Sequence, residues 1–126
     1  MSKRVPVLPG IQPSTSAYSQ VVEANGFVFV AGQVGNDMAT GEIVPGGIEA
    51  ETRALFANIE RCLAAVGLGL GDIVKTTVYL VDMDDWAAYN DVFRELFPVD
   101  PPTRATVAVA GLVPPFRIEA EVIATR

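Results

Sequence analysis

The chain has 126 residues, of which 50% are hydrophobic and 19% are charged, and nine basic against fifteen acidic side chains give a net charge of −6. This length fits a single domain, because one hydrophobic core is typical at roughly 100–150 residues. We therefore treat residues 1–126 as one unit. The acidic balance argues against a surface that holds a phosphate backbone by charge, so nucleic acid is not an expected partner.

The hydrophobic residues are spread along the chain. No stretch approaches the roughly 20 consecutive apolar residues of a membrane helix, and residues 1–10 carry charges and prolines but no apolar signal-peptide core. We expect a cytoplasmic protein with no membrane partner.

The chain contains one cysteine, Cys62, and no histidine. This composition excludes disulfides within the chain, zinc sites of the common Cys/His kind, and Ser-His-Asp or Cys-His catalysis. Chemistry has to come from carboxylates, arginine, lysine, tyrosine, hydroxyls, amides and water. We expect neither a metal nor an organic cofactor.

Two strands are predicted first, over residues 19–24 and 27–31, because they flank Asn25-Gly26, a strong signal for a tight hairpin. The second of these strands is apolar at every position, so both of its faces should be covered. Residues 32–47 are rich in turn formers and predict a long loop with a turn at Thr40-Gly41.

Helical spacing of apolar residues predicts a first helix from Ile48, ending before Gly67. Cys62 lies on its apolar stripe and is expected in the core. A β-branched run over residues 73–81 predicts a third strand. The next predicted helix is capped among aspartates, ends at Pro98, and has an apolar face formed by Trp86, Tyr89, Phe93 and Leu96.

The last two predicted strands cover residues 103–109 and 116–125. If they form a symmetric hairpin, Arg104 lies opposite Glu121 and Thr106 lies opposite Glu119 on a polar face. Arg104 and Glu119 are then diagonal neighbours, within reach of one small ligand.

The order of elements predicts an α+β fold with a mixed sheet and both helices on one face. Two helices cannot cover two faces, so the apolar strand over residues 27–31 needs a second cover. Another copy of the chain is the economical choice, which predicts a symmetric homo-oligomer.

Arg104 and Glu119 are the main candidates for chemistry. A guanidinium is the natural partner of a carboxylate, because its planar fork makes two parallel charge-assisted hydrogen bonds. The alternative for Arg104 is a cross-strand salt bridge to Glu121. Glu119 can orient or deprotonate a water molecule, and its alternative is a solvated position on an outer face.

Three further positions have two interpretations each. Asn90 lies off the apolar stripe of its helix, where it hydrogen-bonds a substrate or faces water. Tyr18 precedes the first strand and offers a hydroxyl with an apolar wall, or packs at a rim. Gly32 marks a close approach of backbone to a ligand, or an ordinary turn.

Five segments stand out along the chain, namely 29–33 (FVAGQ), 40–44 (TGEIV), 71–80 (GDIVKTTVYL), 102–107 (PTRATV) and 118–124 (IEAEVIA). In this order and spacing they resemble successive signature segments of the Rid (reactive intermediate deaminase) family, also called YjgF-like and labelled endoribonuclease L-PSP. The resemblance runs from about Tyr18 to the C-terminus.

The resemblance implies a chorismate-mutase-like subunit that forms a homotrimer with clefts between subunits. It implies that Arg104 holds a substrate carboxylate, that Glu119 is associated with the water, and that Tyr18, Asn90 and the backbone at Gly32 line the pocket. The implied reaction is cofactor-independent hydrolysis of enamines and imines, such as 2-aminoacrylate or 2-iminobutyrate, to 2-keto acids and ammonia.

Two positions depart from the best-matched branch, and both bear on substrate binding. Ala31 stands where serine is common, and Thr106, counted among the substrate-binding positions, stands where cysteine is common. Loss of a hydroxyl at Ala31 shifts substrate preference or lowers the rate. The arginine is intact, so deaminase activity is favoured over a non-catalytic carboxylate-binding module, a pathway-specific branch acting on another substrate, or an endoribonuclease.

Overall fold

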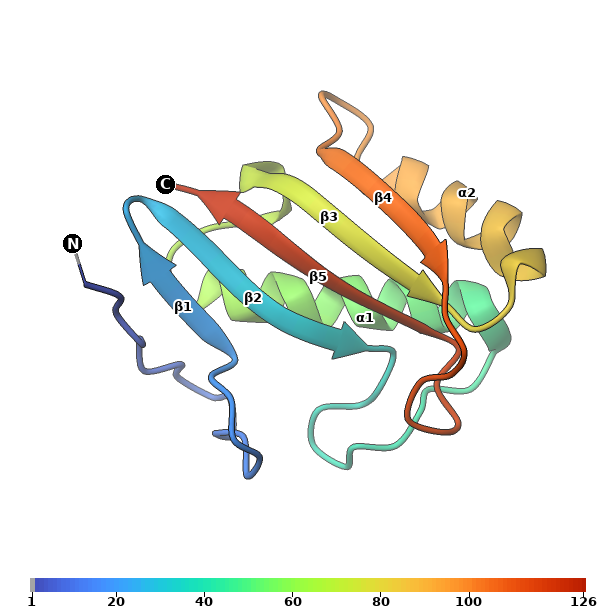
Figure 1. Ribbon diagram of the computed structural model, residues 1–126, viewed down its shortest axis with the longest axis horizontal. Helices are drawn as coiled ribbons and strands as arrows, with labels where there is room; N and C mark the ends of the chain where they lie inside the picture. Colours follow the sequence, from blue (N-terminus) through green and yellow to red (C-terminus); the bar gives the residue numbers. More distant parts are fainter. Residues whose placement is uncertain (1) are drawn as a thin grey trace.

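The structure, a computed structural model, describes residues 2–126. It contains a five-stranded mixed sheet in the order β1-β2-β5-β3-β4, with two α-helices on one face (Figure 1). This is the α+β arrangement that the sequence predicts. In chain order the strands and helices are β1 (Val21–Ala24), β2 (Phe27–Val34), α1 (Gly47–Ala64), β3 (Ile73–Leu80), α2 (Trp86–Leu96), β4 (Thr103–Ala108) and β5 (Ile118–Thr125).

The predicted hairpin of β1 and β2 is present. Asn25 and Gly26 have φ angles of 52° and 81°, the left-handed pair that a two-residue turn of this hand requires. β2 continues beyond the predicted end at residue 31, because a bulge between Val30 and Gln33 lets the strand resume pairing with β5.

The core lies between α1 and the sheet. The predicted apolar stripe of α1 is confirmed, since Leu55, Ile59, Cys62 and Leu63 are fully buried. Burial raises the pKa of the Cys62 thiol, which keeps it in the unreactive protonated form. Cys62 is therefore a core residue, as its spacing predicts.

The predicted hairpin of the last two strands is wrong. β4 is parallel to β3, and β5 lies between β2 and β3, antiparallel to both. The reason is the crossover through α2, which returns the chain beside β3 in the same direction and gives β4 that edge. β5 takes the other edge of β3, where its alternation buries Ile118, Ala120, Val122 and Ala124 against the helices.

The two faces of the sheet differ in cover. The helices bury one face, while the opposite face, called the outer face here, has no layer over it within the chain (Figure 1). On this face Phe27 and Phe29 keep 44% and 41% of their surface exposed. The chain itself therefore covers one face of β2, as predicted, and leaves the other face uncovered. Among residues 2–126, no helix is long and apolar enough to cross a membrane.

Candidate active site

Arg104 lies on the edge strand β4 and points to the helix face. Its neighbour in the β3 register is Thr76, whose side chain is fully buried on that face. The Nη1 atom of Arg104 donates a hydrogen bond of 2.9 Å to Oδ1 of Asn90 on α2. Asn90 lies off the apolar stripe of its helix. It faces the guanidinium and fixes the orientation of that group.

Three aromatic rings of α2 flank the same guanidinium. Its central carbon lies 4.6 Å from the ring centroid of Phe93, 5.3 Å from Tyr89 and 5.8 Å from Trp86. Such contacts stabilise a cation by about 0.5–2 kcal/mol each. Within residues 2–126 Asn90 is the sole hydrogen-bond partner of the Arg104 side chain. The remaining guanidinium N–H groups are thus available to a carboxylate.

Thr106 follows two residues later on the same face of β4. Its Oγ1 lies 2.5 Å from the hydroxyl oxygen of Tyr89, which is fully buried. Arg104, Asn90 and Thr106, together with the α2 rings beneath them, form what we call the arginine half-site.

Glu119 lies on β5 and points to the outer face, beside Tyr79 of β3 and Val34 of β2 in the register. Its carboxylate occupies the space over Gly32, since a Cβ at that glycine would lie 2.5 Å from Oε2 of Glu119. Burial raises the pKa of Glu119, and the negative charge of Glu121 raises it further. Gly32 thus allows another group to approach the backbone closely, and within the chain this group is the Glu119 carboxylate.

Tyr18 lies in the segment before β1 and is 55% exposed. With Gly32 and Gln33 it lines an open cavity of about 820 Å³. Gly32 contacts both this cavity and the Glu119 carboxylate. We call Glu119, Gly32 and Tyr18 the glutamate half-site.

The two half-sites lie on opposite faces of the sheet, so the predicted diagonal contact between Arg104 and Glu119 is wrong. The predicted alternative, a salt bridge from Arg104 to Glu121, is also wrong, because Glu121 accepts a hydrogen bond of 2.9 Å from the Tyr79 hydroxyl on the outer face. Both errors come from the predicted hairpin of β4 and β5, because β3 lies between these two strands in the sheet. One chain assembles each half of the predicted site without joining them.

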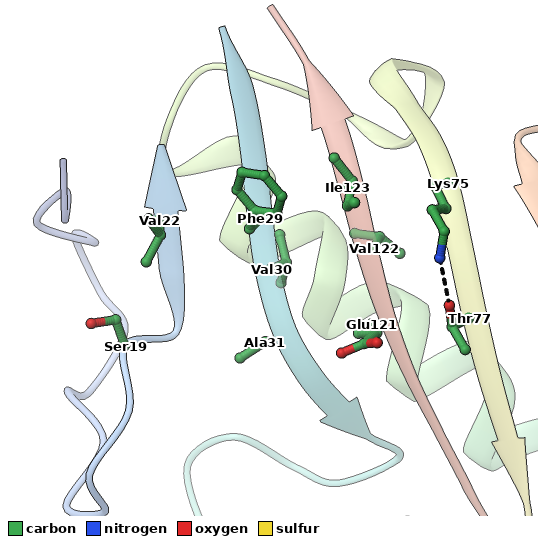
Figure 2. Close-up of a pocket in the computed structure, with 10 residues that line it drawn as sticks. All are labelled: Ser19, Val22, Phe29, Val30, Ala31, Lys75, Thr77, Glu121, Val122 and Ile123. Atoms are coloured by element: carbon green, nitrogen blue, oxygen red, sulfur yellow. Dashed lines mark hydrogen bonds between the residues drawn. The ribbon is translucent and has the colours of Figure 1, made fainter. Parts of the chain in front are cut away.

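The outer face also carries a hollow of about 260 Å³ beside the glutamate half-site (Figure 2). Phe29 gives it an apolar wall, Glu121 and Lys75 line it, and the Lys75 ammonium donates to the Thr77 hydroxyl at 3.0 Å. Ala31, the position that departs from serine, lines the same hollow. A serine at this position would add a hydroxyl to the hollow beside those of Ser19 and Thr77.

The sequence did not reveal the partners of Arg104. Trp86, Tyr89 and Phe93 have the spacing of an ordinary core-facing stripe, and Tyr89 and Phe93 are indeed buried. Their second role depends on β4 running parallel to β3, beneath α2. A usable signal was the adjacency of Tyr89 and Asn90, which places a polar group at the margin of the aromatic stripe.

Over residues 2–126 no group of three or more Cys, Asp or Glu side chains is placed to hold a metal ion. The arrangement offers instead an oriented cation on one face and a partly buried carboxylate on the other. These groups suit binding of a small anion and activation of water.

Comparison with known proteins identifies the family. The family model "Endoribonuclease L-PSP" matches residues 11–126. The chain belongs to this family. A RutC family protein of Pyrococcus horikoshii is 46% identical over 107 residues, covering 85% of each chain. A 2-iminobutanoate/2-iminopropanoate deaminase of Capra hircus is 39% identical over 109 residues, covering 86% of this chain and 80% of its own.

Solved structures of the L-PSP family agree with the fold. The crystal structure of the YjgF gene product of E. coli superposes with a TM-score of 0.88 at 32% identity and covers 99% of both chains. The resemblance of the sequence segments to the Rid or YjgF-like family is thereby confirmed. So is the YjgF-like subunit fold, with its mixed sheet and two helices.

Proposed function

We propose that this protein is a cofactor-independent deaminase that hydrolyses small imines bearing a carboxylate, such as 2-iminobutanoate or 2-aminoacrylate after its tautomerisation, to 2-keto acids and ammonia. The observation that carries the proposal is the guanidinium of Arg104, held by Asn90 and three aromatic rings with donors left for a ligand. Relatives named 2-iminobutanoate/2-iminopropanoate deaminase support the reaction type.

The complete site forms between two subunits. Arg104 and Glu119 lie on opposite faces of one sheet, so a ligand that touches both has to take them from different copies of the chain. The two half-sites are different surfaces, and a repeated contact between two different surfaces forms a ring when its rotation closes. A homotrimer is the smallest such ring above a pair, and the exposed Phe27 and Phe29 give it an apolar interface.

In the proposed reaction Arg104 holds the carboxylate, the one ionic group of the substrate that does not react. Glu119 of the neighbouring copy orients a water molecule and accepts its proton as the oxygen attacks the imine carbon. Glu119 passes this proton to the imine nitrogen, which gives the carbinolamine. The hydroxyl proton of the carbinolamine then moves to the amine as the C–N bond breaks, which releases ammonia and leaves the carbonyl of the keto acid. Water supplies the oxygen, and no electron carrier takes part.

The elevated pKa of Glu119 suits this role. Burial and the charge of Glu121 make its carboxylate a stronger base than an ordinary exposed glutamate. It lies over Gly32, where the missing side chain leaves room for it. The site therefore pairs a fixed cation with a basic carboxylate, as imine hydrolysis requires.

Release of 2-keto acid from freshly generated imino acids tests the proposal. Arg104→Ala should lower kcat/KM by roughly 10²–10⁴-fold, because two hydrogen bonds to a charged group are lost. Arg104→Lys should lose most of the rate although it keeps the charge, since an ammonium fixes position but not plane. Folded Arg104→Ala protein with a near-normal rate would refute the assignment. Retention of the ligand without turnover by the unaltered protein would favour a binding module.

A further inference from the structure

A pair of hydroxyls lies beside the arginine half-site. The Tyr89 and Thr106 oxygens are 2.5 Å apart and join α2 to β4. Tyr89 is fully buried, whereas Thr106 is half-buried, so the pair runs from the core to the surface. Burial raises the pKa of Tyr89 and outweighs the opposing effect of the Thr106 hydrogen bond. The phenol consequently keeps its proton near neutral pH.

The direction of the hydrogen bond between Tyr89 and Thr106 follows from the partners available to each hydroxyl. A buried O–H without an acceptor is strongly unfavourable, and within residues 2–126 the Thr106 oxygen is the one partner of the Tyr89 hydroxyl. Tyr89 therefore donates and Thr106 accepts. A threonine hydroxyl carries one hydrogen of its own, which points away from Tyr89.

The position of this hydrogen is set relative to Arg104. Thr106 and Arg104 alternate onto the same face of β4, and the Arg104 guanidinium lies 5.3 Å from the ring of Tyr89. The charged fork and the Thr106 hydroxyl thus flank a single aromatic ring. We expect a carboxylate bound to the fork to come within reach of this hydroxyl.

We propose that Thr106 donates a third hydrogen bond to the substrate carboxylate held by Arg104, and that Tyr89 is the positioning residue that directs this donor. The inference rests on the proposed function and deepens it. The site then recognises a carboxylate through a cation and a directed neutral donor. Tyr89 acts through Thr106 and does not touch the substrate.

Four variants test the assignment, namely Tyr89→Phe, Thr106→Val, Thr106→Ser and the double variant of the first two. The stable probe is 2-oxobutyrate, whose Kd is measured by calorimetry, alongside KM and kcat for 2-iminobutanoate. Thr106→Val should raise Kd and KM about 5–20-fold with kcat changed less than about twofold, because a contact common to ground and transition states is lost. Thr106→Ser should restore both constants.

Tyr89→Phe keeps the ring under Arg104 and removes only the directing hydroxyl. It should raise Kd and KM about 2–5-fold, and this effect should vanish in the Thr106→Val background, because the two residues act through one donor. Thr103→Val is the matched control, since Thr103 lies on β4 but bonds the Val74 carbonyl at 2.9 Å. Its Kd should equal that of the unaltered protein.

Three outcomes overturn the inference. Unchanged Kd in Thr106→Val and Tyr89→Phe, with only the Tm lowered, would make the pair a packing contact. An effect of Tyr89→Phe that persists without the Thr106 hydroxyl would remove the directing role. An unchanged Kd in Tyr89→Phe alone would do the same. Arg104→Ala separates these results from failure of the proposed function, because normal binding of 2-oxobutyrate by that variant would refute the anchoring role of Arg104 itself.

Discussion

The two faces of the sheet present contrasting environments for charged side chains. On the helix face Arg104 is surrounded within a single chain by Asn90 and the rings of α2, so its orientation is set before any ligand arrives. On the outer face Glu119 lies over Gly32, and Glu121 lines a hollow with Phe29, with no layer over them in the chain. The arginine half-site is therefore arranged within one chain, whereas the glutamate half-site is left uncovered and, under the proposed function, is completed by a second copy.

The largest expected effect comes from placing a charge on the outer face. Phe29→Asp should convert the proposed oligomer to monomers and abolish imine hydrolysis, because a carboxylate would be buried without a partner at the proposed interface. Sedimentation velocity and the keto acid assay measure the two effects. The subunit should stay folded, since Phe29 is already 41% exposed in it.

Val7→Asp is the control for this change, because Val7 is 88% exposed and lies in the N-terminal segment outside the sheet. It should keep both the mass and the activity of the unaltered protein. If Phe29→Asp also keeps its mass and activity, the outer face is not the subunit interface.

Adding one methyl group to the glutamate half-site should have the next largest effect. In Gly32→Ala the new Cβ meets Oε2 of Glu119 at 2.5 Å, so the carboxylate has to move. A displacement of about 1 Å lowers kcat by roughly 10–100-fold. In Gly71→Ala the new Cβ meets nothing within 4 Å, so this variant should keep the rate. Equal rates for the two variants would show that the Glu119 position is unimportant.

Much of this contrast was accessible from the sequence. The Asn25-Gly26 turn, the stripe of α1 and the alternation of β5 each follow from local periodicity, and each was predicted. Three of the five segments of the resemblance contain Arg104 with Thr106, Gly32 and Glu119, while Asn90 and Tyr18 lie outside the segments. Local patterns carry this information because they depend on neighbours a few residues away.

The relation between the half-sites was not accessible in this way. Alternation places Glu119 and Glu121 on one face of β5, but strand order decides what Arg104 faces. That order depends on α2 returning the chain to the edge of β3, a long-range event without a local signature. The aromatic rings around Arg104 were missed for the same reason, since their spacing equals that of any core stripe.

The smallest predicted effect is a shift in pH dependence. The charge of Glu121 helps to raise the pKa of Glu119, and Glu119 has to be ionised to accept a proton from water. The rate should therefore rise with pH through the pKa of Glu119. Glu121→Gln removes the like charge and lowers this pKa, so the rising limb of kcat/KM should move to lower pH. Glu60→Gln, an exposed change on α1, should not move the limb.

An unmoved limb in Glu121→Gln would mean that the rise reports another group. A limb that moves to higher pH would contradict the repulsive coupling between the two glutamates. Either result would leave the outer face without its proposed base.

Subunit mixing tests most directly whether Arg104 and Glu119 of different copies form one site. Arg104→Ala and Glu119→Ala protein, each inactive alone, are unfolded together in equal amounts and refolded. In a ring, a site is intact when the subunit that supplies its arginine is unaltered at 104 and the subunit that supplies its glutamate is unaltered at 119. Each condition holds for half of the subunits in an equal mixture, so random mixing should restore about a quarter of full activity. A mixture of Arg104→Ala with the double variant should stay inactive. A first mixture no more active than its components would contradict the shared site.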